Sequence, residues 1–190
     1  MVVADADEDY PGAARLWWAF QYYGHRQVAV LDGGCDAWCA AGLPLSRKRP
    51  RVPPGHFLPR PQPGFQVSAV EVAAGLTDPA SCLVDTRPWE QYAGLAVWSP
   101  HRSRFLPLGA RHVRVGGVRL RPDRLPGAVH FPSSALLDPL SWRYLLPADL
   151  RAQAEAAGIR PDQRVIAYCG VGGSASLVLF ALRRAVSPTS

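Results

Sequence analysis

Cys169 follows a short apolar run and precedes a glycine-rich turn, a setting in which a thiol could act as a nucleophile. The run from Val165 to Tyr168 is rich in β-branched and aromatic residues and predicts a buried strand, whereas residues 174–184 carry apolar side chains at helical spacing. Cys169 is therefore expected at the carboxyl end of a strand and in front of a helix. The glycines between positions 170 and 173 allow backbone N–H groups to turn toward one point, where they would stabilise a thiolate. A buried structural cysteine is the alternative, but so many glycines favour the nucleophile.

Residues 169–175 resemble the active-site loop of the rhodanese sulfurtransferases, in which a cysteine is followed by a cradle that ends in a small hydroxyl residue and an alanine. Two upstream segments extend the resemblance: residues 83–87 resemble the family's strand-and-turn motif, and residues 125–132 resemble its hydrophobic-Pro-Gly-Ala motif. The first of these motifs continues with Glu90, Tyr92 and Gly94. Because the three motifs occur in family order, we expect an α/β fold of rhodanese type, an open parallel sheet with helices on both faces.

The resemblance implies a sulfurtransferase that works in two steps through a persulfide. The Cys169 thiolate would take a sulfane sulfur from thiosulfate or 3-mercaptopyruvate and pass it to cyanide or to a thiol acceptor such as a thioredoxin-like protein. No metal or organic cofactor is implied. The implied substrate-binding residues are Arg87, Gly170, Val171, Gly172, Gly173 and Ser174.

Two other functions compete with sulfur transfer. A cysteine phosphatase needs an arginine at the sixth position after its cysteine, and this chain has Ala175 there, which disfavours that function. A catalytically inactive rhodanese-like fragment, or a binding or regulatory module of the same fold, is the second alternative. Such modules usually lose the cysteine, whereas this chain keeps Cys169.

Arg87 follows the strand predicted over residues 82–85, so it should share a sheet edge with Cys169. Its guanidinium could bind an anionic substrate group, or it could pair with Glu90 as structural support. Thiosulfate-type loops carry cationic residues just after the cysteine and mercaptopyruvate-type loops carry Gly then Ser, but this loop has Gly170 and Val171. Arg87 or the arginines between residues 95 and 126 would therefore have to supply positive charge for the donor.

The composition, with 48% apolar and 19% charged residues in a chain of 190, is that of one large or two small globular domains. Neither a membrane span nor a signal sequence is recognisable, so we expect a cytoplasmic protein without a membrane partner. The net charge of +6 suits attraction of small anionic donors, and the arginines lack the interleaved aromatic residues of a nucleic-acid platform. The four cysteines lack CxxC spacing and nearby histidines, which argues against a metal site.

Residues 1–45 are expected to form a partial, non-catalytic rhodanese-like unit with the order strand, helix, strand, helix. An internal repeat aligns Ala6 with Cys169 and places the acidic residues 7–9 directly after it, so this unit should carry no nucleophile. Its aromatic residues Trp17, Trp18 and Trp38 are expected to serve core or inter-domain packing.

Residues 46–64 are rich in proline and arginine, which predicts a linker. Residues 65–190 are expected to form the catalytic rhodanese domain without its last strand and helix. The chain thus resembles a tandem thiosulfate/3-mercaptopyruvate sulfurtransferase that is truncated at both ends. Residues 95–126 have no clear period and are expected to be an irregular insertion. Because a sheet short of a strand has an open edge, we expect residues 28–41 to pack against the catalytic domain, where they could supply the missing strand.

Capping residues and breakers delimit the remaining elements. Ser68 and Glu71 have the spacing of a capping box, which predicts a helix start at that point. The other expected helices cover residues 13–23, 35–41 and 147–157, and the other expected strands cover residues 2–4, 28–31 and 82–85.

Overall fold

The structure is a computed structural model that describes residues 1–5, 12–99, 104–107, 113–115, 118–120 and 123–186. Ala6 and the acidic residues 7–9, which the internal repeat sets against the Cys169 loop, lie outside the described residues. None of the helices in the described ranges is long and apolar enough to cross a membrane.

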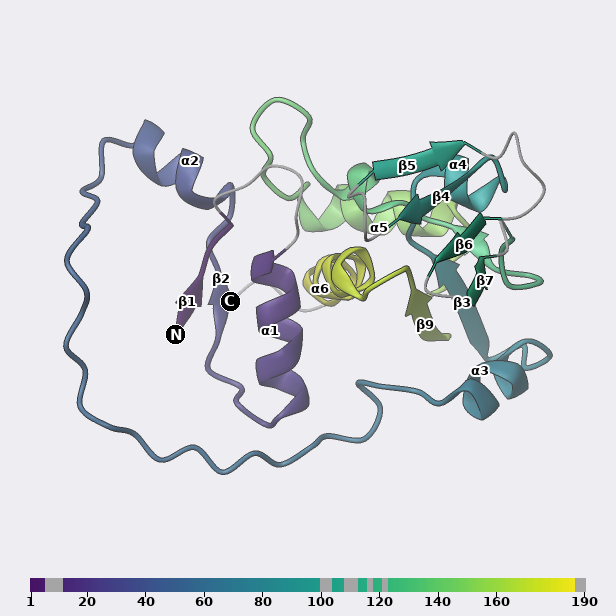
Figure 1. Ribbon diagram of the computed structural model, residues 1–190, viewed down its shortest axis with the longest axis horizontal. Helices are drawn as coiled ribbons and strands as arrows, with labels where there is room; N and C mark the ends of the chain where they lie inside the picture. Colours follow the sequence, from purple (N-terminus) through teal and green to yellow (C-terminus); the bar gives the residue numbers. More distant parts are fainter. Residues whose placement is uncertain (6–11, 100–103, 108–112, 116–117, 121–122, 187–190) are drawn as a thin grey trace.

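A three-stranded parallel sheet forms the centre of the larger part of the chain (Figure 1). Its strands, in spatial order, are β8 (Val129–His130), β3 (Ser81–Asp85) and β9 (Arg164–Tyr168). Asp85 is in register with His130 on one side and with Tyr168 on the other. The three strands therefore end at one edge of the sheet, and Cys169 is the first residue beyond β9 at that edge.

Helices cover both faces of this sheet. They are α3 (Ala69–Gly75), α5 (Pro147–Ala156) and α6 (Gly173–Val186). Successive side chains of a strand face opposite sides, and in β3 Cys82 and Val84 are buried in the cluster that contains α5 and α6. Leu83 lies on the other face, where it forms a second cluster with Ile166 under α3. This arrangement confirms the expected α/β fold.

Local sequence signals set where these helices start. The Oγ of Ser68 accepts the N–H of Glu71, and the Glu71 carboxylate accepts the N–H of Ser68 over 2.8 Å, so the predicted capping box is confirmed. Pro147 occupies the first turn of α5, where its missing N–H costs no hydrogen bond. The turns between these elements contain two short helices that the sequence did not predict, α4 (Trp89–Tyr92) and η1 (Ser133–Leu136).

The N-terminal segment has the expected order of strand, helix, strand and helix. Its elements are β1 (Val2–Val3), α1 (Gly12–Tyr22), β2 (Ala29–Val30) and α2 (Gly34–Ala40). β1 and β2 pair in parallel, with Val2 opposite Ala29, and form a separate two-stranded sheet. The prediction that residues 28–41 supply a strand to the domain of the central sheet is therefore wrong, because among the described strands β2 pairs with β1 and with none of β8, β3 and β9.

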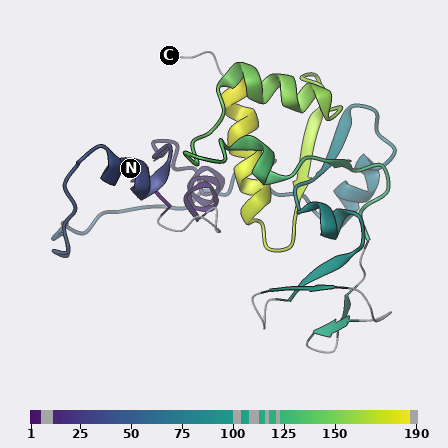
Figure 2. The same cartoon turned by 90° about the horizontal axis from the view of Figure 1, so that it is seen from above.

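The N-terminal segment instead meets the central domain through helix packing. α1 lies beside α6 in both views (Figures 1 and 2). Trp17, 5% exposed, packs edge-on against Phe180 at a centroid distance of 5.0 Å, which confirms its predicted role between the two parts. Asp32 adds a polar contact, because its Oδ1 accepts the backbone N–H of Tyr144 over 2.8 Å.

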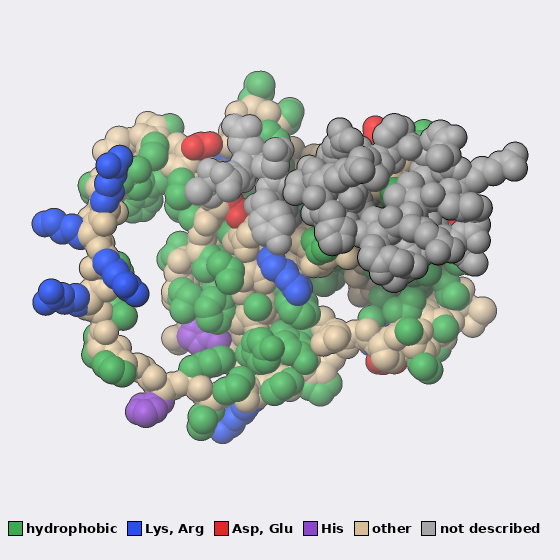
Figure 3. Space-filling view, in the orientation of Figure 1, with side chains coloured by type: hydrophobic (Ala, Val, Ile, Leu, Met, Phe, Trp, Pro, Cys, Tyr) green, Lys and Arg blue, Asp and Glu red, His purple; other side chains and the backbone are tan. Residues whose placement is uncertain are grey.

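Residues 43–60 form an exposed, extended segment that leads away from the rest of the molecule and returns below α1 (Figure 1). Arginine and lysine side chains line the outer part of this excursion (Figure 3). The chain reattaches where the N–H groups of Arg60 and Gln62 donate to the carbonyl oxygens of Tyr23 and Tyr22, over 3.0 and 2.7 Å. These bonds satisfy the free carbonyl groups at the end of α1.

The expectation that residues 95–126 are irregular is wrong, because the described part of that segment contains two antiparallel hairpins; that the segment is an insertion stays a prediction. They pair β4 (Ala96–Ser99) with β5 (Arg104–Pro107), and β6 (Val113–Val115) with β7 (Val118–Leu120). Figure 2 shows both hairpins projecting from the body. Strands of three or four residues are too short to show a clear alternation of polar and apolar positions, which is why the sequence concealed them.

Candidate active site

Cys169 lies, as expected, in the short loop between β9 and α6 at the carboxyl edge of the central sheet. The residue is partly exposed, so it is not sealed inside the core. α6 is 14 residues long and starts at Gly173, so the positive end of its dipole faces the loop. The backbone thus presents a thiol at a position that favours negative charge.

One backbone N–H of the loop contacts the sulfur. Gly172 donates a hydrogen bond to Sγ of Cys169 over 3.0 Å, and its φ of 87° is in the left-handed region that favours glycine. Ser176 fixes Gly172 from the other side, because its N–H and its Oγ both donate to the Gly172 carbonyl oxygen, over 3.1 and 2.7 Å. No hydrogen bond joins Sγ to the N–H groups of the other four loop residues, all of them described: Gly170, Val171, Gly173 and Ser174.

The outer side of the loop is open to solvent, whereas its inner side is built into the core. Val171 is 63% exposed, and Gly170 is also exposed. Gly173 is buried and Ser174 is half-buried, both in the first turn of α6. The N–H groups of a first helical turn have no intrahelical acceptor, so they are available to an anion that approaches from the open side.

Arg87 lies at the same edge of the sheet as Cys169, but its guanidinium is bound to Asp85. Nε is 2.9 Å from Oδ1 and Nη2 is 2.6 Å from Oδ2 of that carboxylate, which is fully buried. Nη2 also donates to the carbonyl oxygen of Asp123 over 3.0 Å. The hydrogen bonds to Asp85 raise the pKa of Arg87 above its usual value. The structural partner of Arg87 is therefore Asp85 and not Glu90, and its role in substrate binding stays a prediction.

The three sequence motifs meet at Tyr168, the residue before Cys169. Its carbonyl oxygen accepts the N–H and the Oγ1 of Thr86, each over 3.1 Å, and its hydroxyl accepts the N–H of Leu125 over 3.1 Å. The guanidinium of Arg87 lies 5.7 Å from the centre of the Tyr168 ring. Burial is the main cause that raises the pKa of Tyr168 to about 12. These contacts hold the start of the Cys169 loop against the strand that carries Arg87.

Arg15 of α1 is a residue at the loop that sequence reasoning missed. A methyl group built on Gly172 would lie 3.0 Å from Nη1 and 3.2 Å from Cζ of Arg15, so the guanidinium lies directly against this glycine. Its Cζ is also 4.3 Å from the centre of the Trp18 ring. The apolar spacing of residues 13–23 predicted the helix, but the face that meets the Cys169 loop is decided by the packing of α1 on α6, which no local pattern reveals.

The other three cysteines lie in different surroundings, and all four are free thiols. Cys82 is 6% exposed, and burial raises the pKa of its thiol. Cys35 is half-buried and Cys39 is exposed, both on the short helix α2. Of the four thiols, Cys169 is the one that a backbone N–H and a long helix N-terminus approach.

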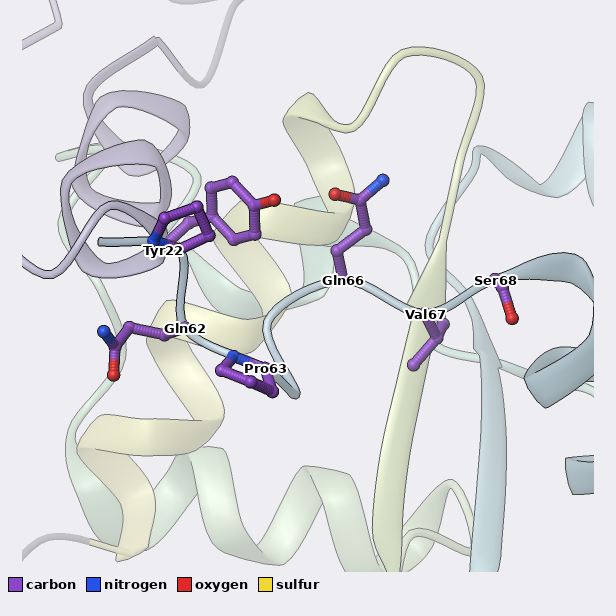
Figure 4. Close-up of a pocket in the computed structure, with 7 residues that line it drawn as sticks. Tyr22, Gln62, Pro63, Gln66, Val67 and Ser68 are labelled. Atoms are coloured by element: carbon purple, nitrogen blue, oxygen red, sulfur yellow. The ribbon is translucent and has the colours of Figure 1, made fainter. Parts of the chain in front are cut away.

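A pocket of about 310 Å³ lies between the end of α1 and the segment that leads into α3. Figure 4 shows the Tyr22 hydroxyl and the Gln66 amide pointing to the same side of this pocket, with Gln62 and Val67 below them. Cys169 is not among its lining residues. The reaction that the loop could support therefore takes place outside this pocket, on the open side of the Cys169 loop.

The chain belongs to the rhodanese family. A sequence model of the family described as "Rhodanese-like domain" matches residues 68–187, a range that contains the Cys169 loop, Arg87 and the whole central sheet. The parallel sheet with helices on both faces is the fold that this membership entails.

Relatives of known name are sulfur-handling proteins. The chain is 33% identical over 188 residues to a probable 3-mercaptopyruvate sulfurtransferase of Pseudomonas aeruginosa, with 95% of this chain and 58% of the relative covered. It is 27% identical over 186 residues to the sulfur carrier protein TtuD of Thermus thermophilus, with 96% of this chain and 61% of the relative covered. The solved structure of SseA from Escherichia coli, titled as a 3-mercaptopyruvate sulfotransferase with the rhodanese fold, superposes with a TM-score of 0.71 at 25% identity over 97% of this chain and 61% of that one. The chain thus spans about three-fifths of the length of these relatives.

Proposed function

We propose that the protein is a sulfurtransferase that moves a sulfur atom, the thiol sulfur of 3-mercaptopyruvate or the sulfane sulfur of thiosulfate, to a thiol or cyanide acceptor through a persulfide on Cys169. The observation that carries this proposal is the hydrogen bond from the Gly172 N–H to Sγ at the N-terminus of α6. A group that donates to the sulfur stabilises its thiolate, which is the reactive nucleophile.

In the first half-reaction the thiolate attacks the outer sulfur of the donor. With thiosulfate, the Sγ–S bond forms as the bond between the two donor sulfurs breaks, and sulfite leaves with the electron pair. With 3-mercaptopyruvate, the C–S bond breaks, its electron pair stays on carbon, and the thiol proton ends on that carbon to give pyruvate. Either donor leaves a Cys169 persulfide whose terminal sulfur is anionic.

The N-terminus of α6 suits this intermediate. The terminal sulfur extends beyond Sγ. Gly173 and Ser174 follow Gly172 in the chain and lie in the first turn of α6, where backbone N–H groups have no intrahelical acceptor. Donors that are fixed before the reaction stabilise the developing charge without reorganisation. We therefore assign Gly172 to the thiolate and Gly173 with Ser174 to the persulfide.

In the second half-reaction the acceptor attacks the terminal sulfur and Cys169 leaves as the thiolate. Cyanide would leave as thiocyanate, and a thiol would leave as its own persulfide. The exposed Val171 side of the loop gives room for a protein thiol, as a thioredoxin-like acceptor would require. The cytoplasm, where thiols stay reduced, is the compartment that we propose for this chemistry.

The alternative is a catalytically inactive binding or regulatory module. The retained cysteine, its hydrogen bond from Gly172 and its partial exposure all favour catalysis over that alternative. The same features serve no purpose in a module that only binds a partner, because a buried apolar residue would pack the strand end equally well.

The decisive experiment is intact-protein mass spectrometry after incubation with 3-mercaptopyruvate or with thiosulfate, followed by peptide mapping. We expect the gain of one sulfur atom on the peptide that contains Cys169, and its loss when cyanide is added. Comparison of the two donors at equal concentration identifies the preferred one. Absence of a persulfide with both donors in a folded sample would refute the proposal in favour of the inactive module. A persulfide on Cys35 or Cys39 and not on Cys169 would refute the assignment of Cys169.

A further inference from the structure

We propose that Arg15, which comes from the N-terminal segment, supplies the positive charge that an anionic sulfur donor meets at Cys169. The inference rests on the proposed function, because it assigns a charge-selecting residue to that same site. It also gives the N-terminal segment a role in the reaction, whereas its sequence predicts a unit without any chemistry.

The first observation is that Arg15 and the Cys169 sulfur share one neighbour. The N–H of Gly172 donates to Sγ, while the Cα of Gly172 faces the guanidinium so closely that an added methyl group would lie 3.0 Å from Nη1. The guanidinium and the Cys169 sulfur are therefore both direct neighbours of Gly172. The proposal places the anionic group of a donor in front of Sγ at this guanidinium.

The second observation is how Arg15 is held. Its guanidinium stacks on Trp18, whose Nε1 donates to the carbonyl oxygen of Phe65 over 3.1 Å. Trp18 stacks in turn on Tyr22, with ring centres 5.2 Å apart and an angle of 4° between the planes. A cation above an aromatic ring is oriented without the use of its N–H donors. The column along α1 thus fixes the guanidinium without using its N–H groups.

The third observation separates Arg15 from Arg87. Nε and Nη2 of Arg87 are bound to Asp85. Among the described residues, by contrast, no carboxylate or carbonyl oxygen is hydrogen-bonded or ion-paired with Arg15. Its charge is therefore not neutralised by a described neighbour, and Arg15 is the better placed of the two to attract an anion.

The chemistry of the donors matches this cation. Thiosulfate carries a sulfonate-like group and 3-mercaptopyruvate carries a carboxylate, and a guanidinium binds such groups with two parallel hydrogen bonds. The loop has Gly170 and Val171 after the cysteine, so it contains no cationic side chain at these positions. Arg15 replaces, from another part of the chain, the positive charge that the loop lacks.

A direct test compares two alkylating agents of similar size on Cys169, the anion iodoacetate and the neutral iodoacetamide. Both react with the same thiolate, so the ratio of their rates cancels any change in thiol ionisation and reports the local charge. In Arg15→Gln we expect this ratio, measured on the Cys169 peptide, to fall roughly five-fold. Arg15→Lys keeps the charge and should keep most of the ratio. An unchanged ratio in Arg15→Gln, with the iodoacetamide rate preserved, would overturn the proposal.

Arg183→Gln is the matched control. Arg183 also stacks on a tryptophan of α1, at 5.8 Å from the ring centre of Trp17, but it lies in the last turn of α6, far along the helix from the loop. Its loss should leave the alkylation ratio unchanged. A fall of equal size in Arg183→Gln would assign the effect to general positive charge or to loosened packing, and would also overturn the proposal.

Sulfur-transfer kinetics complete the test and separate the two proposals. Arg15→Gln should raise KM for the anionic donor about ten-fold with a smaller change in kcat, because the guanidinium binds the group that does not react. If the native chain forms no persulfide at all, the proposed function fails. The ratio of the two alkylation rates still shows whether Arg15 contributes positive charge at Cys169. If the native chain transfers sulfur and Arg15→Gln has native KM and native ratio, only the role of Arg15 fails.

Discussion

Asp85 and Arg87 are bound to each other by two parallel hydrogen bonds at the carboxyl end of β3, with the carboxylate fully buried and the guanidinium side chain 16% exposed. The same carboxylate accepts the backbone N–H of Arg87 over 3.1 Å, which closes a tight turn at the end of the strand. The pair thus shapes the chain at the sheet edge where Cys169 also lies.

Arg87→Ala tests whether this pair is structural. Removal of the cation leaves the buried Asp85 charge without its partner, so we expect the free energy of unfolding to fall by about 3 kcal/mol. Urea denaturation measures this loss, and the double variant with Asp85→Asn should recover part of it. A native stability combined with a raised KM for the donor would instead support the predicted substrate role of Arg87.

Cysteine variants test the assignment of the nucleophile. Cys169→Ser should abolish persulfide formation with little change in stability, because a hydroxyl of similar size is too weak an acid to ionise there. Cys82→Ser should keep the activity of the folded fraction, since burial raises the pKa of the Cys82 thiol and keeps it protonated. Substoichiometric iodoacetamide with peptide mapping should label Cys169 first. Faster labelling of Cys82 in the folded protein would contradict both assignments.

The raised pKa of Tyr168 predicts how the free energy of unfolding changes at alkaline pH. Its pKa is raised to about 12 in the folded protein, mainly by burial, whereas an unfolded tyrosine titrates near 10. The unfolded state therefore loses its proton first, so the stability contribution is full below pH 10 and is lost as the pH rises toward 12. Denaturation at pH 9 and pH 11 should show a smaller alkaline loss in Tyr168→Phe than in the native chain. An equal loss in both would mean that Tyr168 is not buried as described.

Trp17→Ala tests the interface between α1 and α6. The substitution removes a ring that is 5% exposed and packs on Phe180, so we expect a loss of about 3 kcal/mol and faster hydrogen exchange in α6. Trp38→Ala is the control, because Trp38 is only half-buried on α2 and its Nε1 donates to the nearby carbonyl oxygen of Pro44. If α6 keeps its protection in Trp17→Ala, the two parts of the chain are not coupled through this contact.

The sequence predicted the rhodanese-like part of the fold well because its signals are local. The glycines around Cys169, the capping box at Ser68 and the apolar run before Asp85 each act within a few residues, and all three features appear in the structure. Family resemblance added the order of the motifs, which the contacts of Tyr168 explain.

What the sequence concealed depends on contacts between distant residues. No periodicity shows that Arg15 faces Gly172, because 157 positions separate them and the contact arises when α1 packs on α6. The partner of Arg87 was misjudged for a different reason. Asp85 is the last residue of a strand, and the turn that follows it brings the backbone N–H and the guanidinium of Arg87 to its carboxylate. The hairpins after Leu95 were missed because their strands are short.

The long excursion of residues 43–60 has a practical consequence. Its residues are exposed and carry several sites for trypsin, among them Arg47, Lys48 and Arg51. The contacts between α1 and α6 and from Asp32 to Tyr144, which join the two parts of the chain, lie outside it. A cut in the excursion therefore leaves a nicked complex of two fragments held by these contacts, and the protein could be reassembled from separately expressed pieces, with Arg15 on one piece and Cys169 on the other.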